Sequence, residues 1–194
     1  IILLIFNKNL ENFDFSNSKF DLTSEFAFDV DLKKKNKIKN LKVNSKINLD
    51  ELILKYDLNK IENYINNYNN LIKLKDSKIN IKYSEKEFLI DGSSKFYIEN
   101  DFKNLLNFKI KKIKNAINFE TFLNLKNVDL KLNDISYNKK KNTHATLEIK
   151  GSQSIFLGKT SSEILLKNIN YAEGKNIIEI NNLKIDNNKI LDID

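Results

Sequence analysis

The chain has 194 residues with no cysteine, no methionine, no proline and four glycines, and all of its 33 basic residues are lysine. This length allows one domain with a hydrophobic core, the 41% of hydrophobic residues is too high for a disordered chain, and the lack of cysteine excludes disulfides and thiolate metal sites. The net charge of +7 does not indicate nucleic-acid binding, because no arginine is present for bidentate contacts and the lysines alternate with apolar residues.

The sequence opens with the apolar run "IILLIF" at 1–6. A membrane-spanning helix needs about 20 apolar residues, so a buried strand is the better interpretation of this run. Because the chain does not begin with methionine, we expect residues 1–194 to form a single segment of a longer, repetitive protein.

The main signal along the chain is the alternation of apolar and polar residues, which is typical of strands with one buried face. The alternating apolar positions, in chain order, are Phe26, Phe28, Val30, Leu32, Leu41, Val43, Ile47, Leu49, Phe88, Ile90, Phe96, Ile98, Leu106, Phe108, Ile110, Ile117, Phe119, Leu123, Leu125, Val128, Leu130, Leu132, Leu147, Ile149, Ile164, Leu166, Leu183 and Ile185. Their parity changes after Leu125, which predicts a turn or bulge near 126–127. The sequence therefore predicts a mainly β fold with a long, twisted, mostly antiparallel sheet.

One segment departs from this alternation. Leu58, Ile61, Ile65 and Tyr68 follow the spacing of an apolar helical stripe, and the asparagine-rich residues after them are a natural stop. The sequence predicts a short amphipathic helix near 58–70.

A weak internal repeat accompanies the strands. The triplet Ile-x-Tyr occurs at 81–83, 135–137 and 169–171, and a polar turn and a new alternating run follow each copy. Two of the returning strands are similar, "FLIDGSS" and "LEIKGSQS". Either hairpins in a biased composition look alike, or a repeated hairpin unit extends one long sheet.

Residues that could carry chemistry are few. His144 is the single histidine and lies in a polar turn, so it has no second histidine or cysteine to complete a metal site or a triad. Asp29 and Asp31 fall on the polar side of a strand, which is typical of a solvated face. The "GKT" at 158–160 lacks the upstream glycine of a phosphate-binding loop. We therefore predict a protein that is not an enzyme, with no catalytic residue, no metal and no cofactor.

Strands with one apolar face must bury that face against something. The sheet can pack on a second sheet as a sandwich, close on itself as a barrel, or curl into a trough whose lining a lipid completes.

In "FLIDGSSKFYI", "FETFLNLKNVDLKLNDISY" and "THATLEIKGSQSIF", the chain resembles the AsmA-like superfamily of Gram-negative envelope proteins, in particular its TamB and YhdP type. The resemblance covers 26–194 and rests on periodicity. It implies a long β-sheet curled into a taco-like groove. It also implies a periplasmic protein that is anchored in the inner membrane by a segment outside this chain and carries phospholipid toward the outer membrane.

On this interpretation the acyl chains of phospholipids are the ligands, and partner proteins in the envelope are unknown. The candidate lining residues of the groove are Phe88, Ile90, Phe96, Ile98, Phe108, Ile110, Phe119, Leu123, Leu130 and Leu132. Alternation shows which residues share a face, and the same residues would equally form a dry core.

Two other classes of protein remain open. One is a structural or adhesin-like β-sandwich with a dry core. The other is an outer-membrane barrel, which the pattern disfavours because the phenylalanines are spread along the strands and do not form girdles at two rims.

Overall fold

The computed structural model describes residues 13–14, 16, 18–34, 37–55, 65, 71–98, 103–133, 136–156, 159–186 and 189–192. Its elements are β1 (Phe13–Asp14), β2 (Phe20–Asp31), the 3-10 turn η2 (Leu32–Lys34), β3 (Lys37–Lys55), β4 (Leu71–Tyr83), β5 (Glu87–Tyr97), β6 (Asn104–Ile113), β7 (Ala116–Asn124), β8 (Leu130–Leu132), β9 (Tyr137–Lys139), β10 (Ala145–Phe156), β11 (Lys159–Glu173), β12 (Asn176–Asp186) and β13 (Lys189–Asp192). No helix in the described part of the chain is both long enough and apolar enough to cross a membrane.

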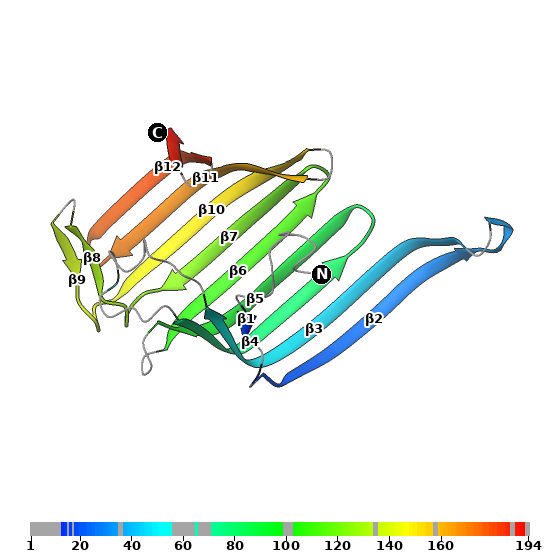
Figure 1. Cartoon of the computed structure of the whole chain (residues 1–194), viewed down its shortest axis with the longest axis horizontal. Coiled ribbons are helices and arrows are strands. Elements are labelled where there is room, and N and C mark those ends of the chain that lie inside the picture. Colours follow the sequence, from blue (N-terminus) through cyan, green and yellow to red (C-terminus); the bar gives the residue numbers. More distant parts are fainter. Residues whose placement is uncertain are drawn as a thin grey trace.

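Nine long strands form one antiparallel sheet in the order β2-β3-β4-β5-β6-β7-β10-β11-β12, and the short strands β1 and β13 pair with β3 and β12. Neighbouring long strands follow one another in the chain except for β7 and β10, between which β8 and β9 form a separate two-stranded ribbon. Figure 1 shows β2 as the outermost strand at one edge, with the ribbon standing off the opposite half of the sheet. The predicted mainly β, antiparallel fold is confirmed.

The register of the strands explains the alternation in the sequence, because paired residues lie on the same face of the sheet. One row of paired residues crosses seven strands and is mostly apolar: Ile79, Gly92, Phe108, Thr121, Ile149, Ile169 and Ile180. The adjacent row, on the other face, is polar throughout: Asn80, Asp91, Lys109, Glu120, Lys150, Asn168 and Asn181. The sheet therefore has one apolar face and one polar face, with alternating charges across the four central strands of the polar row.

Serine residues on the apolar face bond to one another. The hydroxyls of Ser77 and Ser94 are 2.8 Å apart and buried, and those of Ser24 and Ser45 are also 2.8 Å apart. These pairs satisfy hydrogen-bonding groups that would otherwise be costly beside hydrocarbon.

The apolar face holds two buried clusters. The first consists of Ile81, Phe88 and Ile90, near the turn that joins β4 to β5. The second, with Phe96, Leu125, Val128 and Ala145, lies at the end of the sheet where the ribbon packs through Leu130. The expected turn near 126–127 is confirmed, because β7 ends at Asn124 and the chain turns there before β8.

The sheet is open and is not strongly curled, so the predicted taco-like curl is wrong for the described strands. Curvature in sheets comes from bulges and glycine kinks, and the pairings β5–β6, β6–β7 and β7–β10 run without any register shift. The helix expected near 58–70 lies outside the described residues except for Ile65, which forms an isolated antiparallel bridge with Leu130.

Candidate functional site

The structure brings most of the candidate lining residues together on the apolar face. Those of β5, β6 and β7 and the adjoining Ile98 are Phe88, Ile90, Phe96, Ile98, Phe108, Ile110, Phe119 and Leu123. Ile90 is only 2% exposed, Phe88 and Phe96 are also buried, and the other five are half-buried. Leu130 and Leu132 lie apart from them on the ribbon, where Leu130 packs against the cluster around Phe96.

The most exposed apolar surface lies elsewhere, on the edge strand β2. Five of its side chains on the apolar face are between 44% and 67% exposed: Phe20, Leu22, Phe26, Phe28 and Val30. A central residue has neighbours on both adjacent strands, whereas β2 pairs only with β3 among the strands that the structure describes. The alternation in the sequence predicts that Phe26, Phe28 and Val30 share one face, but they are not among the predicted lining residues. Phe20 and Leu22 are also at even-numbered positions, so the same alternation would have placed them on this face.

A groove of about 600 Å³ lies on the apolar face where β4 turns into β5. Apolar side chains form its floor, and the rings of Tyr83 and Phe88 meet edge to face there with centroids 6.4 Å apart. The floor residues are Leu41, Val43, Ile81, Tyr83 and Phe88, and three lysines complete the lining at the end of the sheet: Lys86, Lys112 and Lys114.

The tight turn at the end of this groove is well ordered by hydrogen bonds. The Ser84 N–H donates to the Glu87 carbonyl at 2.8 Å, and the Glu87 N–H donates back to the Ser84 carbonyl at 3.3 Å. This closes a two-residue hairpin loop at Glu85 and Lys86, which places the backbone of both residues at the end of the floor.

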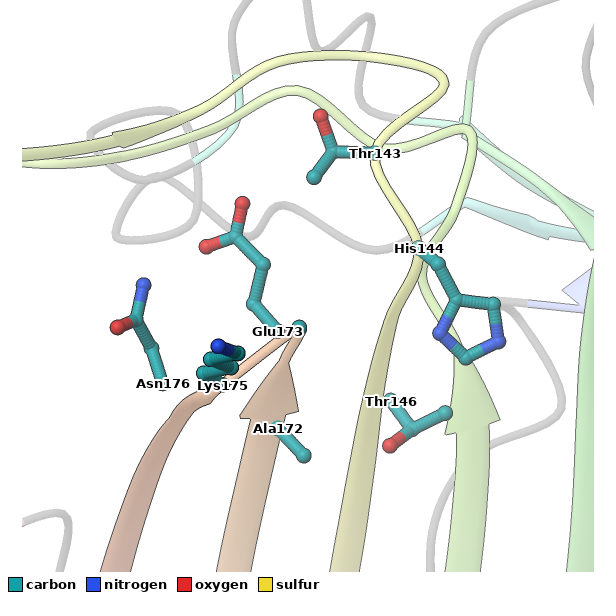
Figure 2. Close-up of a pocket in the computed structure, with 8 residues that line it drawn as sticks. Thr143, His144, Thr146, Ala172, Glu173, Lys175 and Asn176 are labelled. Atoms are coloured by element: carbon teal, nitrogen blue, oxygen red, sulfur yellow. The ribbon is translucent and has the colours of Figure 1, made fainter.

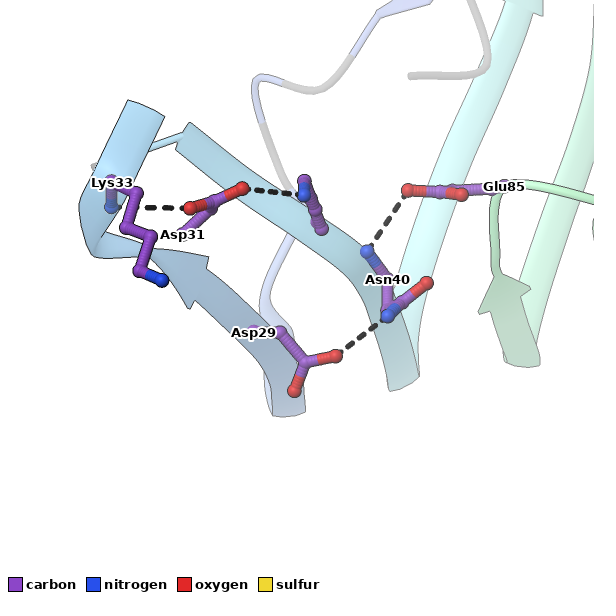
Figure 3. A network of polar contacts seen from close by, with 6 residues as sticks. Asp29, Asp31, Lys33, Asn40 and Glu85 are labelled. Carbon is purple, nitrogen blue, oxygen red and sulfur yellow. Dashed lines mark hydrogen bonds and ion pairs between the residues drawn. The ribbon is translucent and has the colours of Figure 1, made fainter. Parts of the chain in front are cut away.

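A polar network holds this turn against the end of β2 and β3. Asn40 has a positive φ of 52°, a conformation that asparagine tolerates better than most residues, at a register shift between β2 and β3. Its backbone N–H donates to Glu85 Oε1 at 2.9 Å, and its side-chain amide donates to Asp29 Oδ2 at 2.6 Å, as Figure 3 shows. Asn40 therefore links β2 and β3 to the turn between β4 and β5, and its N–H is bonded to one oxygen of the Glu85 carboxylate.

The charges around the groove are unbalanced toward positive. Glu87 forms an ion pair with Lys111 on the polar face, at 2.9 Å, and Glu85 is held by Asn40. By contrast, Lys86, Lys112 and Lys114 are exposed and form no ion pair with any described residue. Lys112 is also unusual in its register, because it lies on the apolar face directly opposite Phe88 and Ile117.

A second hollow, of about 550 Å³, lies near the turns that precede β10 and join β11 to β12, and includes His144 and Glu173. Figure 2 shows that the imidazole, just before β10, and this carboxylate, at the end of β11, point in different directions. Within the described ranges, no group of three or more histidine, cysteine or acidic side chains could hold a metal ion.

The buried polar groups beside this hollow fasten the ribbon to the sheet. The Tyr137 hydroxyl donates to the Glu173 carboxylate and lies 2.6 Å from the Tyr171 hydroxyl. Burial, then the bonds to Glu173 and Tyr171, raise the pKa of Tyr137, which keeps the phenol protonated as a donor. Lys139, fully buried, donates to the carbonyls of Val128, Lys140 and Lys126 at 2.7, 3.1 and 3.3 Å. These contacts give both residues a structural role.

Comparison of the chain with protein-family models, with curated proteins and with solved structures finds no match.

Proposed function

We propose that the chain binds the hydrocarbon tails of lipids on the apolar face of its sheet and does not catalyse a reaction. The observation that carries this proposal is the exposed apolar surface of β2, where five large side chains lie side by side along one strand. Contiguous exposed apolar surface of this kind marks an interaction site in a folded protein. Lipid tails suit it because they need no hydrogen-bonding partner.

The expected affinity for a lipid tail is low enough for the tail to move along the sheet without an energy source. A tail of about 14 methylenes that lies on an open sheet buries about half of its surface, which is worth about 5–6 kcal/mol. This gain is close to the cost of immobilising a ligand, about 4–15 kcal/mol. A single tail would therefore bind weakly and move readily to the next apolar row, which is what transfer along a surface requires.

The wider setting follows from the resemblance to AsmA-like envelope proteins. We propose that this sheet is one wall of a longer apolar groove, which further strands complete beyond its two ends at β2 and at β12 with β13. In that arrangement the whole protein is periplasmic, is anchored in the inner membrane by a segment outside this chain, and carries phospholipid between the two membranes.

The alternative is an interaction domain with a dry core, in which another protein sheet covers the apolar face. It is favoured by β2, which pairs only with β3 among the described strands, since an edge strand with an apolar face readily accepts another strand. Lipid analysis separates the two functions.

The test is mass spectrometry of lipids that copurify with the chain, with two variants that differ only in the face they alter. Phe26→Glu puts a charge on the apolar face of β2 at a side chain that is 64% exposed, and Ala27→Glu puts the same charge on the polar face of the same strand. We expect the wild type and Ala27→Glu to carry lipid and Phe26→Glu to carry several-fold less. A wild type without lipid, or equal loss in both variants, refutes the proposal.

A further inference from the structure

We infer that the groove between Leu41 and Lys114 binds an amphiphile with an anionic headgroup, whose phosphate or carboxylate contacts the lysines while its tail lies on the apolar floor. This inference rests on the proposed function and adds the charge of the ligand and the place where its head binds. It is argued from three features of the groove.

The first feature is the division of the groove into an apolar part and a cationic part. The side chains of Val43, Ile81 and Phe88 form the floor, while the exposed ammonium groups belong to residues at the strand ends. A ligand that satisfies both parts must have a hydrocarbon portion and a negative charge at one end. The groove volume of about 600 Å³ falls within the range of small-molecule sites.

The second feature is that neither acidic residue of the groove forms an ion pair with one of its three lysines. The two acidic residues that line the groove are engaged, Glu85 by the Asn40 N–H and Glu87 by Lys111. The three lysines of the groove are without an ion pair in the part of the chain that the structure describes. An anionic headgroup would therefore contact ammonium groups that form no ion pair with a described carboxylate.

The third feature is the position of Lys112. The strand register places it on the apolar face between Phe88 and Ile117, both of which are buried. A lysine in such a row keeps its charged end in water and lays its aliphatic stem along the apolar surface. Its ammonium is thus held at the boundary between the apolar face and solvent, where the head of a bound lipid would lie.

The chemistry of lysine limits the selectivity. A lysine ammonium is a point charge with three donors, so it attracts phosphate and carboxylate alike and does not impose the paired geometry of arginine. A phosphocholine head carries its own cation, which the lysines repel. The groove should therefore distinguish anionic heads from zwitterionic heads, but not phosphate from carboxylate.

A path for the tail continues from the groove toward β2. The floor residue Val43 is paired directly with Phe26 of β2, so the floor of the groove adjoins the exposed apolar side chains of that strand. A tail that begins at the lysines can therefore run from the groove to the exposed apolar side chains of the edge strand.

The test uses ligands with the same tail and different heads. Dodecyl phosphate, dodecanoate and dodecylphosphocholine are titrated below their micelle concentrations by calorimetry, with inorganic phosphate as the free anion. Solvated ion pairs each contribute little, so three of them give an expected preference of about tenfold for the two anionic amphiphiles over dodecylphosphocholine. We expect this preference to shrink as the salt concentration rises.

Two triple variants distinguish an effect of these three lysines from an effect of the net charge of the protein. Lys86, Lys112 and Lys114 are changed together to glutamine, and the control changes Lys46, Lys78 and Lys82, which lie on the polar face of β3 and β4, in the same way. The preference should vanish in the first triple variant and persist in the second.

Each other outcome is decisive. Equal affinity of the wild type for the anionic and zwitterionic amphiphiles overturns this inference and leaves the proposed function standing, as does equal loss in both triple variants. Binding of inorganic phosphate as tight as that of dodecyl phosphate shows a simple anion site and overturns it too. If no amphiphile binds, the proposed function fails together with this inference.

Discussion

Two glycines show how single residues set the packing of the apolar face. Gly92 on β5 lies opposite Phe108 on β6, and Gly151 on β10 lies opposite Phe119 on β7. Each ring covers its glycine, since a Cβ built at Gly92 would lie 2.8 Å from Phe108 Cζ. Glycine weakens a strand, and an aromatic ring across it restores the lost contact. The similar strands "FLIDGSS" and "LEIKGSQS" thus place their glycines under equivalent rings.

We predict that Gly92→Val lowers the free energy of unfolding by about 1–3 kcal/mol, the usual cost of overpacking. The new Cβ would stand 2.5 Å from the Lys78 carbonyl oxygen, which belongs to the backbone and cannot rotate away. Urea denaturation measures the change. Gly174→Asn is the control. A Cβ built at Gly174 would have no contact within 4 Å, and asparagine tolerates its φ of +58°. A Gly92→Val variant as stable as the wild type would contradict this packing.

Single residues also show what the sequence could reveal. Lys112 has the same parity as Phe108 and Ile110, so counting along 108–112 would have placed a charge on the apolar face. Nothing in the sequence indicates that Glu85 is held by Asn40, because that contact joins residues 45 positions apart across two hairpins.

At the scale of elements, the ribbon of β8 and β9 depends on one buried lysine. Lys139 is fully buried and donates to three backbone carbonyls. We predict that Lys139→Met lowers the free energy of unfolding by about 1–3 kcal/mol, because it leaves the Val128 carbonyl, whose contact with Lys139 is buried, without this donor. Lys131→Met on β8 is the control, since Lys131 is exposed. Equal stability of the two variants in urea denaturation would show that the carbonyl contacts contribute nothing.

The same lysine gives a pH dependence. Burial lowers the pKa of Lys139 from 10.5, against smaller raising effects of Glu173 and Asp129. The unfolded chain then binds this proton more tightly than the folded chain, so this group makes stability rise with pH between the lowered pKa and 10.5. The stability advantage of the wild type over Lys139→Met should therefore be constant near neutral pH and widen as the pH approaches 10.5. A narrowing advantage would contradict the direction of the pKa shift.

The strands were predictable because the alternation of apolar and polar residues within each strand is visible in its own sequence. The side chains of a strand alternate between faces, so a run such as 104–113 shows its apolar side without knowledge of its partners. The order of the strands largely follows the chain, as hairpins require. The ribbon between β7 and β10 was not predicted, because its two strands are only three residues long and share their alternation with the main sheet.

At the scale of the whole molecule, the described strands form an open sheet with one apolar face and one polar face. The sequence could predict the two faces of the sheet but not its degree of curl. Curl depends on the twist of the strands and on bulges between them, and the alternation of apolar and polar residues indicates neither. Exposure is likewise a property of the whole sheet. Phe26 and Phe108 have the same pattern around them in the sequence, yet Phe26 is 64% exposed on the edge strand and Phe108 packs against the cluster of β4 and β5.

The central claim is that hydrocarbon binds the apolar face, and photo-crosslinking tests it most directly. A fatty acid with a benzophenone group in its tail is irradiated with the protein, and the modified residues are located by mass spectrometry. We predict labels that excess unlabelled fatty acid removes, on apolar-face residues of β2 to β5 such as Phe26, Phe28 and Tyr83, and few on polar-face residues such as Asp21 and Lys82. Labels spread evenly over both faces, or labels that the competitor does not remove, would contradict the claim.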